Sequence, residues 1–285
     1  MASTHTTFGR FASHHRLLAR NGRQGRKPAL DDTPLVLVEG DSWLAMPLYH
    51  DIADHLERSA GGVFLRQGRH GDTAARMFDG RSLARIERNL KAFGFDLLLV
   101  SAGGNDLVDA LEKTRGKPLF GKTHGLTTPE KAVEHVRAAG VLAGIRTHYL
   151  RLLEVAARAG VPVLGHSYDH PQRMGVPIRL SVAQLGLAAL FKRRAGDWIA
   201  RWIRHVLPDD PDQRAFARGL IDAFVADVLD TLPAPFHYAD LRGQLAQEKD
   251  WNDELHPTQA AFARLAPLLR ARARGLLPAG KQAAW

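Results

Sequence analysis

The sequence contains no cysteine. This absence excludes disulfide bonds, thiolate catalysis and cysteine-ligated metal sites. No stretch approaches the roughly 18 consecutive apolar residues that a membrane span requires, and residues 1–30 lack the apolar run of a secretory signal, so we expect a cytoplasmic location. The P-loop pattern and the Gly-x-Gly-x-x-Gly pattern are missing too, so no nucleotide cofactor is expected.

Acidic residues are missing from the first 30 positions, which carry six of the nine net positive charges of the chain. The remaining residues are close to charge balance, so the basic character belongs to this terminal segment. We expect residues 1–30 to form a mobile, solvated leader, with contact to an anionic surface or to nucleic acid as the alternative. Residues 31–285 have the composition of a globular protein and are assigned to a single domain.

Five short apolar segments predict the strands of the fold. Their apolar runs are continuous, as in strands that are buried on both faces, and helix-length segments separate them. This order predicts βαβ units, a mainly parallel sheet and helices on both faces, which is an α/β fold. The predicted strands are residues 34–39, 63–66, 96–102, 161–166 and 236–241.

The segments between these strands predict the helices. One amphipathic helix is expected directly after the first strand, and a helix start is expected where a threonine precedes a proline at positions 128 and 129. The predicted helices are residues 44–58, 74–93 with an interruption at Gly80, 128–159 and the basic segment 259–274.

Residues 168–233 are richer in helix than in strand, and we expect them to be a helical insertion in the single domain. Apolar residues such as Trp198 and Trp202 alternate here with lysine and arginine. The pattern predicts an amphipathic helix packed on the core, or a lid or acyl-binding wall that contacts lipid surfaces. The two interpretations are compatible.

The first predicted strand ends in the motif Gly40-Asp41-Ser42. Ligands of open α/β sheets bind at the carboxyl ends of the strands, so a serine in this turn is a candidate nucleophile. Aspartate and serine are also favoured helix caps, and the motif alone does not decide between the two roles.

Three further loops are predicted at the same edge of the sheet: Gly71-Asp72-Thr73, Gly103-Gly104-Asn105-Asp106 and Asp253-x-x-His256. Acyl transfer needs a serine that attacks, a histidine that accepts its proton and a carboxylate that orients the imidazole. The loops therefore predict Ser42 as nucleophile, His256 as general base and Asp253 as the residue that orients it. The spacing of three residues would place Asp253 and His256 on one side of a helical turn.

The tetrahedral intermediate of acyl transfer also needs donors for its oxyanion. The predicted donors are the backbone N–H groups of Ser42 and Gly71 and the side-chain amide of Asn105. For Asp41 and Asp106, capping or loop bracing is favoured over a catalytic role. The cluster at residues 166–170, with two histidines and an aspartate, is interpreted as a pocket wall rather than a metal site.

These four motifs resemble those of the SGNH hydrolases, also called the GDSL esterase/lipase family, and span residues 40–257. The resemblance implies a three-layer α/β/α sandwich with a flavodoxin-like, parallel five-stranded sheet. It also implies metal-free ester hydrolysis without a cofactor, through a covalent acyl-serine intermediate. The chain departs from the family at Trp43, where the family name has leucine, and in the insertion at 168–233. Trp43 is expected either to pack in the core or to limit the acyl group.

The sequence thus predicts a serine esterase that hydrolyses carboxylic esters with small or short acyl groups. Alternatives that use the same site are an O-acetyl-carbohydrate esterase, a lysophospholipase and a thioesterase. An alternative from a different class is a non-catalytic flavodoxin-like binding module. The expected partner is a small-molecule ester; no nucleic acid is expected, and no oligomeric state is predicted.

Overall fold

The computed structural model describes residues 7–113, 117–121, 125, 128–176 and 197–285. A five-stranded parallel sheet with the strand order β2-β1-β3-β4-β5 lies at the centre of the molecule. This is the flavodoxin-like order, so the predicted α/β fold class is confirmed. The strands are β1 (Leu35–Gly40), β2 (Val63–Arg66), β3 (Leu97–Ser101), β4 (Val163–His166) and β5 (Phe236–Ala239).

Strand β1 pairs with β2 on one side and with β3 on the other. Val36 lies opposite Phe64 of β2 and Leu97 of β3. All six residues of β1 are buried, which explains why its apolar run is continuous rather than alternating. The strand order reverses between β1 and β3, and open α/β sheets bind ligands beside such a switch point.

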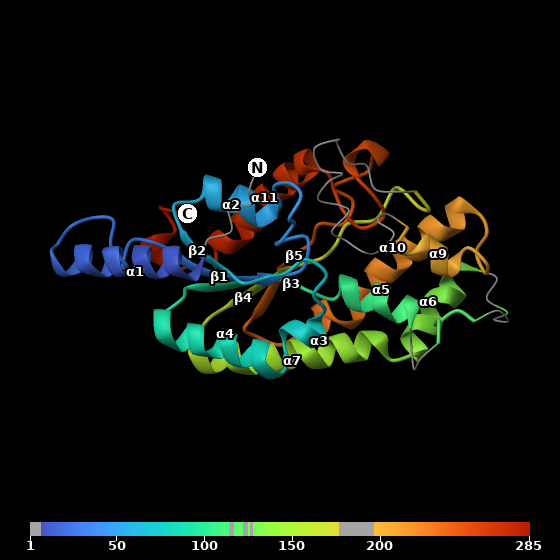
Figure 1. The fold of residues 1–285 in the computed structure, drawn as a ribbon, viewed down its shortest axis with the longest axis horizontal. Coiled ribbons are helices and arrows are strands. Elements are labelled where there is room, and N and C mark those ends of the chain that lie inside the picture. Colours follow the sequence, from blue (N-terminus) through green and yellow to red (C-terminus); the bar gives the residue numbers. More distant parts are fainter. Residues whose placement is uncertain (1–6, 114–116, 122–124, 126–127, 177–196) are drawn as a thin grey trace.

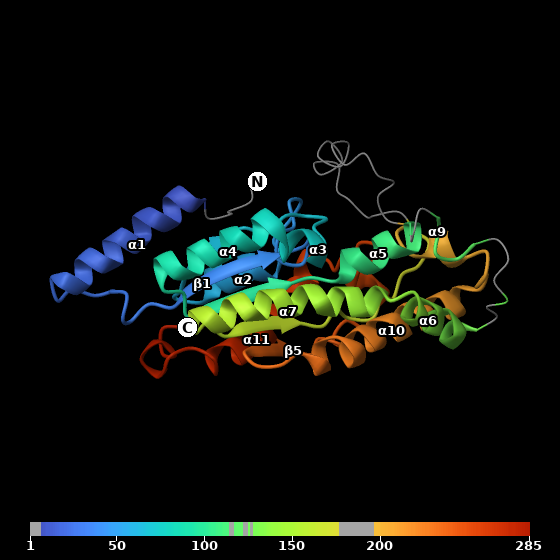
Figure 2. The same ribbon diagram turned by 90° about the horizontal axis from the view of Figure 1, so that it is seen from below.

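Helices cover both faces of the sheet (Figures 1 and 2). On one face α2 (Ile52–Ser59) packs against α11 (Gln259–Arg274). On the other face α4 (Gly80–Phe93) packs against α7 (Val141–Ala159), together with α3 (Ala74–Met77) and α5 (Gly104–Glu112). Further elements are α1 (Phe8–Arg23), α6 (Pro129–Ala138), α9 (Ala200–Ile203), α10 (Asp210–Asp227), and the 3-10 helices η1 (Leu229–Thr231), η2 (Glu248–Asp250) and η3 (Ala279–Lys281).

The helix predicted to follow Ser42 directly is wrong in its start. Residues 41–44 form a turn, and α2 begins only at Ile52. Asp51 caps α2: its side chain accepts the N–H of Asp54, whose side chain accepts the N–H of Asp51. Arg66 binds both carboxylates at 2.7 and 2.6 Å. This buried ion cluster fixes the start of α2 eight residues later than the apolar pattern suggested. Its arginine comes from β2, so the local sequence around the helix does not indicate the cluster.

The long helix predicted from Thr128 to residue 159 is two helices. Thr128 caps α6 as expected, accepting the N–H of Lys131. The chain then breaks at Gly140, whose φ of +78° lies in the left-handed region. Glycine adopts this conformation without the steric cost that other residues pay, so α7 starts in a new direction.

Residues 1–30 were predicted to be a mobile leader, whereas Phe8–Arg23 form helix α1. Phe11 and Leu18 are buried, and the Phe11 ring stacks on Phe95 and meets Phe93 edge-on. The basic side chains remain on the outer side of this helix. The division of the chain into a leader and one domain otherwise stays a prediction.

The predicted insertion, residues 168–233, is described only in part. Within it, α9 and α10 are helical, and α10 packs against α6 and α7. Residues 177–196, which carry much of the predicted amphipathic or lid segment, lie outside the described residues. Across the described part of the chain, no helix combines the length and the apolar character needed to cross a bilayer.

Candidate active site

The turn that carries Ser42 is held by the buried carboxylate of Asp41. One carboxylate oxygen accepts the backbone N–H of Trp43 at 3.0 Å and the hydroxyl of Ser101 at 2.7 Å. The other accepts the hydroxyl of Tyr168 at 2.5 Å. Asp41 thus joins the ends of β1, β3 and β4. Burial raises its pKa to about 6, although the three hydrogen bonds favour the charged form. These contacts match bracing of the turn rather than helix capping.

The loop between η2 and α11 carries Asp253 and His256. The predicted contact between the two side chains is present, but the loop is not a helical turn. Instead Asp253 accepts the backbone N–H groups of Leu255 and His256, each at 2.8 Å. The backbone N–H of Asn252 donates to the His256 carbonyl at 2.8 Å. The loop is therefore closed on itself, and this closure sets the position of the imidazole.

Ser42, His256 and Asp253 lie in one hydrogen-bonded line. The Nε2 atom of His256 lies 3.0 Å from Ser42 Oγ. Its Nδ1 atom lies 2.9 and 2.8 Å from the two carboxylate oxygens of Asp253. Ser42 and His256 are each 5% exposed and Asp253 is fully buried. This is the geometry in which a histidine accepts the proton of a serine hydroxyl.

Burial, neighbouring charges and hydrogen bonds set the pKa values of His256 and Asp253. Burial alone lowers the pKa of His256, but the charge and hydrogen bond of Asp253 outweigh it and raise the pKa above 6.5. Burial alone raises the pKa of Asp253, but His256 and several donors outweigh it and lower the pKa. Asp253 is therefore ionised, and the imidazole is a stronger base than a free one.

The loops after β2 and β3 lie beside this line. The ring of His70, next to Gly71, lies 5.8 Å from the His256 ring. Asn105 donates its side-chain amide to the Asp72 carbonyl at 2.9 Å, and Asn105 lines the same pocket as Ser42. Gly71 lies between His70 and Asp72, so the structure brings all five predicted site residues into one region. Asp106 accepts the N–H groups of Ala74 and Ala75 at 2.7 and 3.4 Å, which is a bracing contact.

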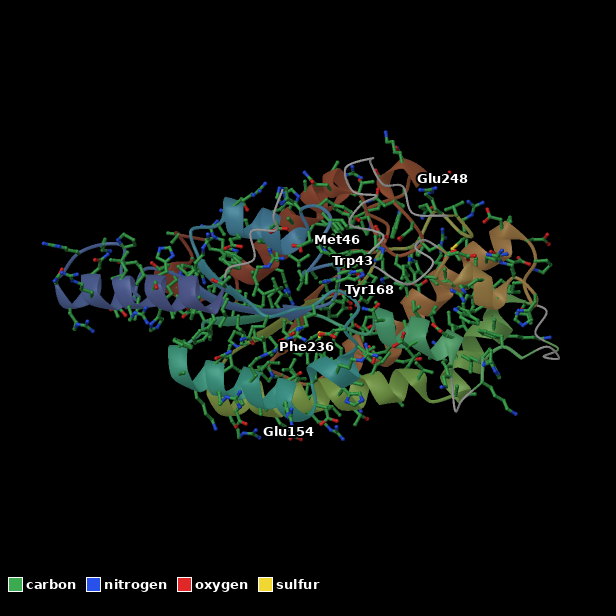
Figure 3. The ribbon with its side chains drawn as sticks, viewed as in Figure 1. Trp43, Met46, Glu154, Tyr168, Phe236 and Glu248 are labelled. Carbon is green, nitrogen blue, oxygen red and sulfur yellow. The ribbon has the colours of Figure 1, made fainter. Side chains whose placement is uncertain are left out.

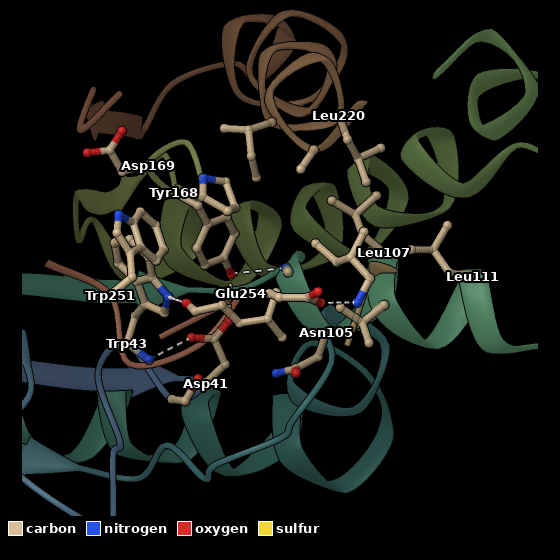
Figure 4. Close-up of a pocket in the computed structure, with 18 residues that line it drawn as sticks. Asp41, Trp43, Asn105, Leu107, Leu111, Tyr168, Asp169, Leu220, Trp251 and Glu254 are labelled. Carbon is tan, nitrogen blue, oxygen red and sulfur yellow. Dashed lines mark hydrogen bonds between the residues drawn. The ribbon is translucent and has the colours of Figure 1, made fainter. Parts of the chain in front are cut away.

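An apolar pocket extends from Ser42 between α5 and α10 (Figure 4). Ser42, Trp43 and Asn105 are among the residues that line it. The empty volume of the pocket, including its opening to solvent, is about 580 Å³. Aliphatic side chains of the two helices form much of the wall: Leu107, Val108, Leu111, Ala217, Leu220 and Ile221.

Trp43 packs in the core, as one of its two expected roles requires; whether it limits the acyl group stays a prediction. The side chain is buried and its ring meets Tyr168 edge-on at 5.2 Å and stacks on His166 at 5.4 Å. Trp43 and Tyr168 lie next to each other at the carboxyl end of the sheet (Figure 3). Trp43 also lines the pocket, so it belongs to the core and to the pocket wall at once.

Several residues of the site received no specific role from the sequence. The hydroxyl of Tyr168 accepts the N–H of Gly104 at 3.0 Å and donates to Asp41. Trp198 donates its indole N–H to Asp253 at 3.2 Å. Gly68 lies against β1 so closely that a Cβ would stand 2.4 Å from the Gly40 carbonyl oxygen. Of these residues, only Tyr168 carried a signal in the sequence, because its position after a predicted strand indicated a place in the pocket wall. The contacts themselves join distant parts of the chain, which no local pattern indicates.

The histidine cluster at residues 166–170 does not converge on one point. His166 contacts the Ser167 carbonyl at 2.8 Å, whereas His170 pairs with Asp222 at 3.0 Å. Tyr168 and Asp169 line the pocket, as predicted for a pocket wall. Among the described residues, no group of three or more histidine, aspartate or glutamate side chains is placed to hold a metal ion.

The fold and the site together define an α/β/α protein with a serine, a histidine and an aspartate in line at the carboxyl edge of the sheet. No family model matches the chain, and no curated protein matches it. Among solved structures, it is similar to the lipase Lip_vut3 from a goat rumen metagenome, with 15% identity, a TM-score of 0.53, and coverage of 84% of this chain and 97% of the lipase. That likeness shows a shared fold.

Two further solved structures resemble the chain more weakly. A GDSL-like lipase from Bacteroides thetaiotaomicron has 12% identity and a TM-score of 0.42, over 94% of this chain and 98% of the lipase. A mutant of an acetyl-xylooligosaccharide esterase from Geobacillus stearmophilus has 12% identity and a TM-score of 0.43, over 85% and 95% of the two chains.

Proposed function

We propose that the chain is an SGNH-type serine hydrolase that cleaves carboxylic esters through an acyl-serine intermediate. The observation that carries this proposal is the hydrogen-bonded line from Ser42 Oγ through His256 to Asp253 beside an apolar pocket. A binding module has no need of a serine that is hydrogen-bonded to a histidine–aspartate pair beside a pocket. The fold shared with a lipase is in keeping with this proposal.

In the first half of the reaction, Ser42 Oγ attacks the ester carbonyl carbon and His256 Nε2 takes the hydroxyl proton. The carbonyl oxygen becomes an oxyanion, and Asp253 stabilises the imidazolium. The ester C–O bond then breaks, and His256 returns its proton to the leaving alcohol. A water activated by His256 hydrolyses the acyl-serine, which releases the carboxylic acid and restores Ser42.

The oxyanion would be held by the backbone N–H groups of Ser42 and Gly71 and by the Asn105 amide. Within the described residues, neither of the two backbone N–H groups donates to another protein group. The bond from Asn105 to the Asp72 carbonyl uses one of its two amide protons, which leaves the second for the substrate. Each such donor contributes about 100- to 1000-fold in rate.

The substrate proposed for this site is an ester with a small or short acyl group. An apolar wall suits a hydrocarbon chain, because burying each CH₂ group contributes about 0.8 kcal/mol. The pocket has an empty volume of about 580 Å³, part of it open to solvent, which lies within the range of small-molecule sites, about 300–1,000 Å³. It suits a chain of a few carbons, and the ester panel below tests this chain length against a long fatty acyl chain.

Turnover of p-nitrophenyl esters from acetate to palmitate tests the proposal, with an acetylated sugar, a lysophospholipid and a thioester in the same panel. We expect the highest kcat/KM for short acyl chains. Turnover of all esters should be lost in Ser42→Ala. Ser59→Ala, which removes a hydroxyl at the end of α2, should keep the rate. No turnover of any member of the panel would contradict the proposed activity.

A further inference from the structure

The described part of the insertion meets the loop that carries Asp253 and His256. Trp198 Nε1 lies 3.2 Å from Asp253 Oδ2, and the Trp198 ring meets the His256 ring edge-on at 6.3 Å. The next residue of the loop, Glu254, accepts the N–H groups of Ile199 and Ala200. Two consecutive carboxylates of the loop therefore bind one short segment of the insertion.

Trp198 differs in kind from the other donors to Asp253. A carboxylate offers about four acceptor positions on two oxygens. The backbone N–H groups of Leu255 and His256, which are on the same loop, donate to Oδ1, and His256 Nδ1 lies within hydrogen-bond distance of both oxygens. Such contacts move with the loop and do not fix the carboxylate relative to the rest of the protein. Trp198 comes from 55 residues away in the sequence and ties Oδ2 to a separate element.

Glu254 explains why Trp198 stays in this position. Its carboxylate is fully buried and accepts the N–H of Gly175 at 2.5 Å, in addition to those of Ile199 and Ala200. Glu254 also lines the pocket (Figure 4). Burial raises the pKa of Glu254 to about 7, while the three backbone donors favour its charged form. These three hydrogen bonds anchor the residues next to Trp198 on the loop.

We infer that Trp198 is a positioning residue for the Asp253–His256 pair, so that the insertion completes the surroundings of the Asp253 carboxylate. The inference rests on the proposed function. Trp198 acts through Asp253: its indole N–H donates to Oδ2 and disperses part of the negative charge of the carboxylate. The insertion thereby has a part in setting the basicity of His256.

Loss of this donor has a defined consequence for His256. A hydrogen bond to a carboxylate disperses its charge, so its removal leaves a stronger attraction for the imidazolium. The pKa of His256 should therefore rise when Trp198 cannot donate. The other titratable groups that face the pair are Asp41 after β1, His70 after β2 and, towards Asp253, Tyr49, and the substitution leaves them in place.

The first test is an NMR titration of the His256 imidazole in the wild type, Trp198→Phe and the control Trp202→Phe. Trp202 lies four residues further on, is half-buried and stacks under Arg201. We expect a higher His256 pKa in Trp198→Phe and an unchanged one in Trp202→Phe. An unchanged or lower pKa in Trp198→Phe overturns the inference. This readout does not depend on ester turnover, so it remains decisive even if the proposed activity fails.

The second test separates the hydrogen bond from ring packing. Trp198→Gln and Trp198→Leu both lose the ring, but only glutamine can donate to Asp253. We expect kcat/KM for a short p-nitrophenyl ester to be about tenfold or more higher in the glutamine variant, since a hydrogen bond to a charged group is lost in the leucine variant. Equal rates and equal His256 pKa values in the two variants would show a packing role only and overturn the inference.

Discussion

Trp43, the residue after Ser42, donates its indole N–H to the backbone carbonyl of Leu255, the residue before His256, at 3.0 Å. The bond joins positions 212 residues apart in the sequence. It therefore sets the nucleophile turn and the histidine loop at a fixed separation, independently of the hydrogen bond between Ser42 and His256. A leucine at position 43 could not make this bond.

Trp43→Phe should lower kcat for a short ester by about tenfold while KM changes little, because it removes one hydrogen bond and leaves most of the ring packing. Steady-state kinetics measure both constants. Trp285→Phe is the matched control: its indole N–H donates to the Arg270 carbonyl at 2.9 Å, with no contact to the site. Equal kcat in the two variants would mean that the Trp43 bond does not position the site.

Leu220→Ala should shift acyl preference towards longer chains, because Leu220 of α10 lines the pocket and its truncation enlarges the space. The ratio of kcat/KM for octanoate over butyrate should rise about tenfold, since a pocket discriminates by roughly 1–3 kcal/mol per methylene. Leu269→Ala, in the buried face of α11, controls for loss of stability. A ratio that changes equally in both variants would argue against this pocket as the acyl site.

The rate should depend on the neutral form of His256. Its pKa is raised above 6.5, with the charge of Asp253 opposing the effect of burial, so kcat/KM should rise with pH through a value above 6.5. In Asp253→Asn the raising charge is gone and burial remains, so this limb should move to lower pH as the rate falls by about 10³–10⁴-fold. A pH–rate profile of both proteins measures it; a limb at higher pH in the variant would contradict this electrostatic account.

Phe11→Ala should destabilise the protein without slowing the reaction. Phe11 of α1 is fully buried against Phe93 and Phe95, and truncating a buried phenylalanine costs about 3–5 kcal/mol. Chemical denaturation measures the loss, and kcat/KM should stay within about twofold because α1 does not contact the site. Leu17→Ala on the exposed side of the same helix should leave the stability unchanged. Equal stability in both variants would contradict this account and support the prediction that residues 1–30 form a mobile leader.

The sequence predicted the strands well because their signal is local. Each run of apolar residues lies within two residues of the observed strand ends, and the polar loops follow from the parallel topology. The start of α2 could not be predicted in this way, since Asp51 and Asp54 cap the helix together with Arg66 of another element. The packing of Phe11 depends similarly on Phe93 and Phe95, about eighty residues away, which no local pattern indicates.

The candidate site shows the same division. Ser42, Asp253 and His256 were predicted from short motifs whose spacing has a chemical reason, and the structure places them in contact. Trp198 reaches Asp253 across 55 residues, and in the sequence it is only one apolar residue among many in the insertion. Its indole N–H becomes informative only when its partner is known.

The central claim is that Ser42 is an activated nucleophile, and active-site labelling tests it most directly. An alkyl phosphonate that forms a covalent bond with activated serines should label the wild-type protein once, and peptide mass analysis should place the adduct on Ser42. His256→Gln should slow the labelling strongly because no base is left to accept the hydroxyl proton. An unlabelled wild-type protein, or an adduct on any other residue, would contradict the account.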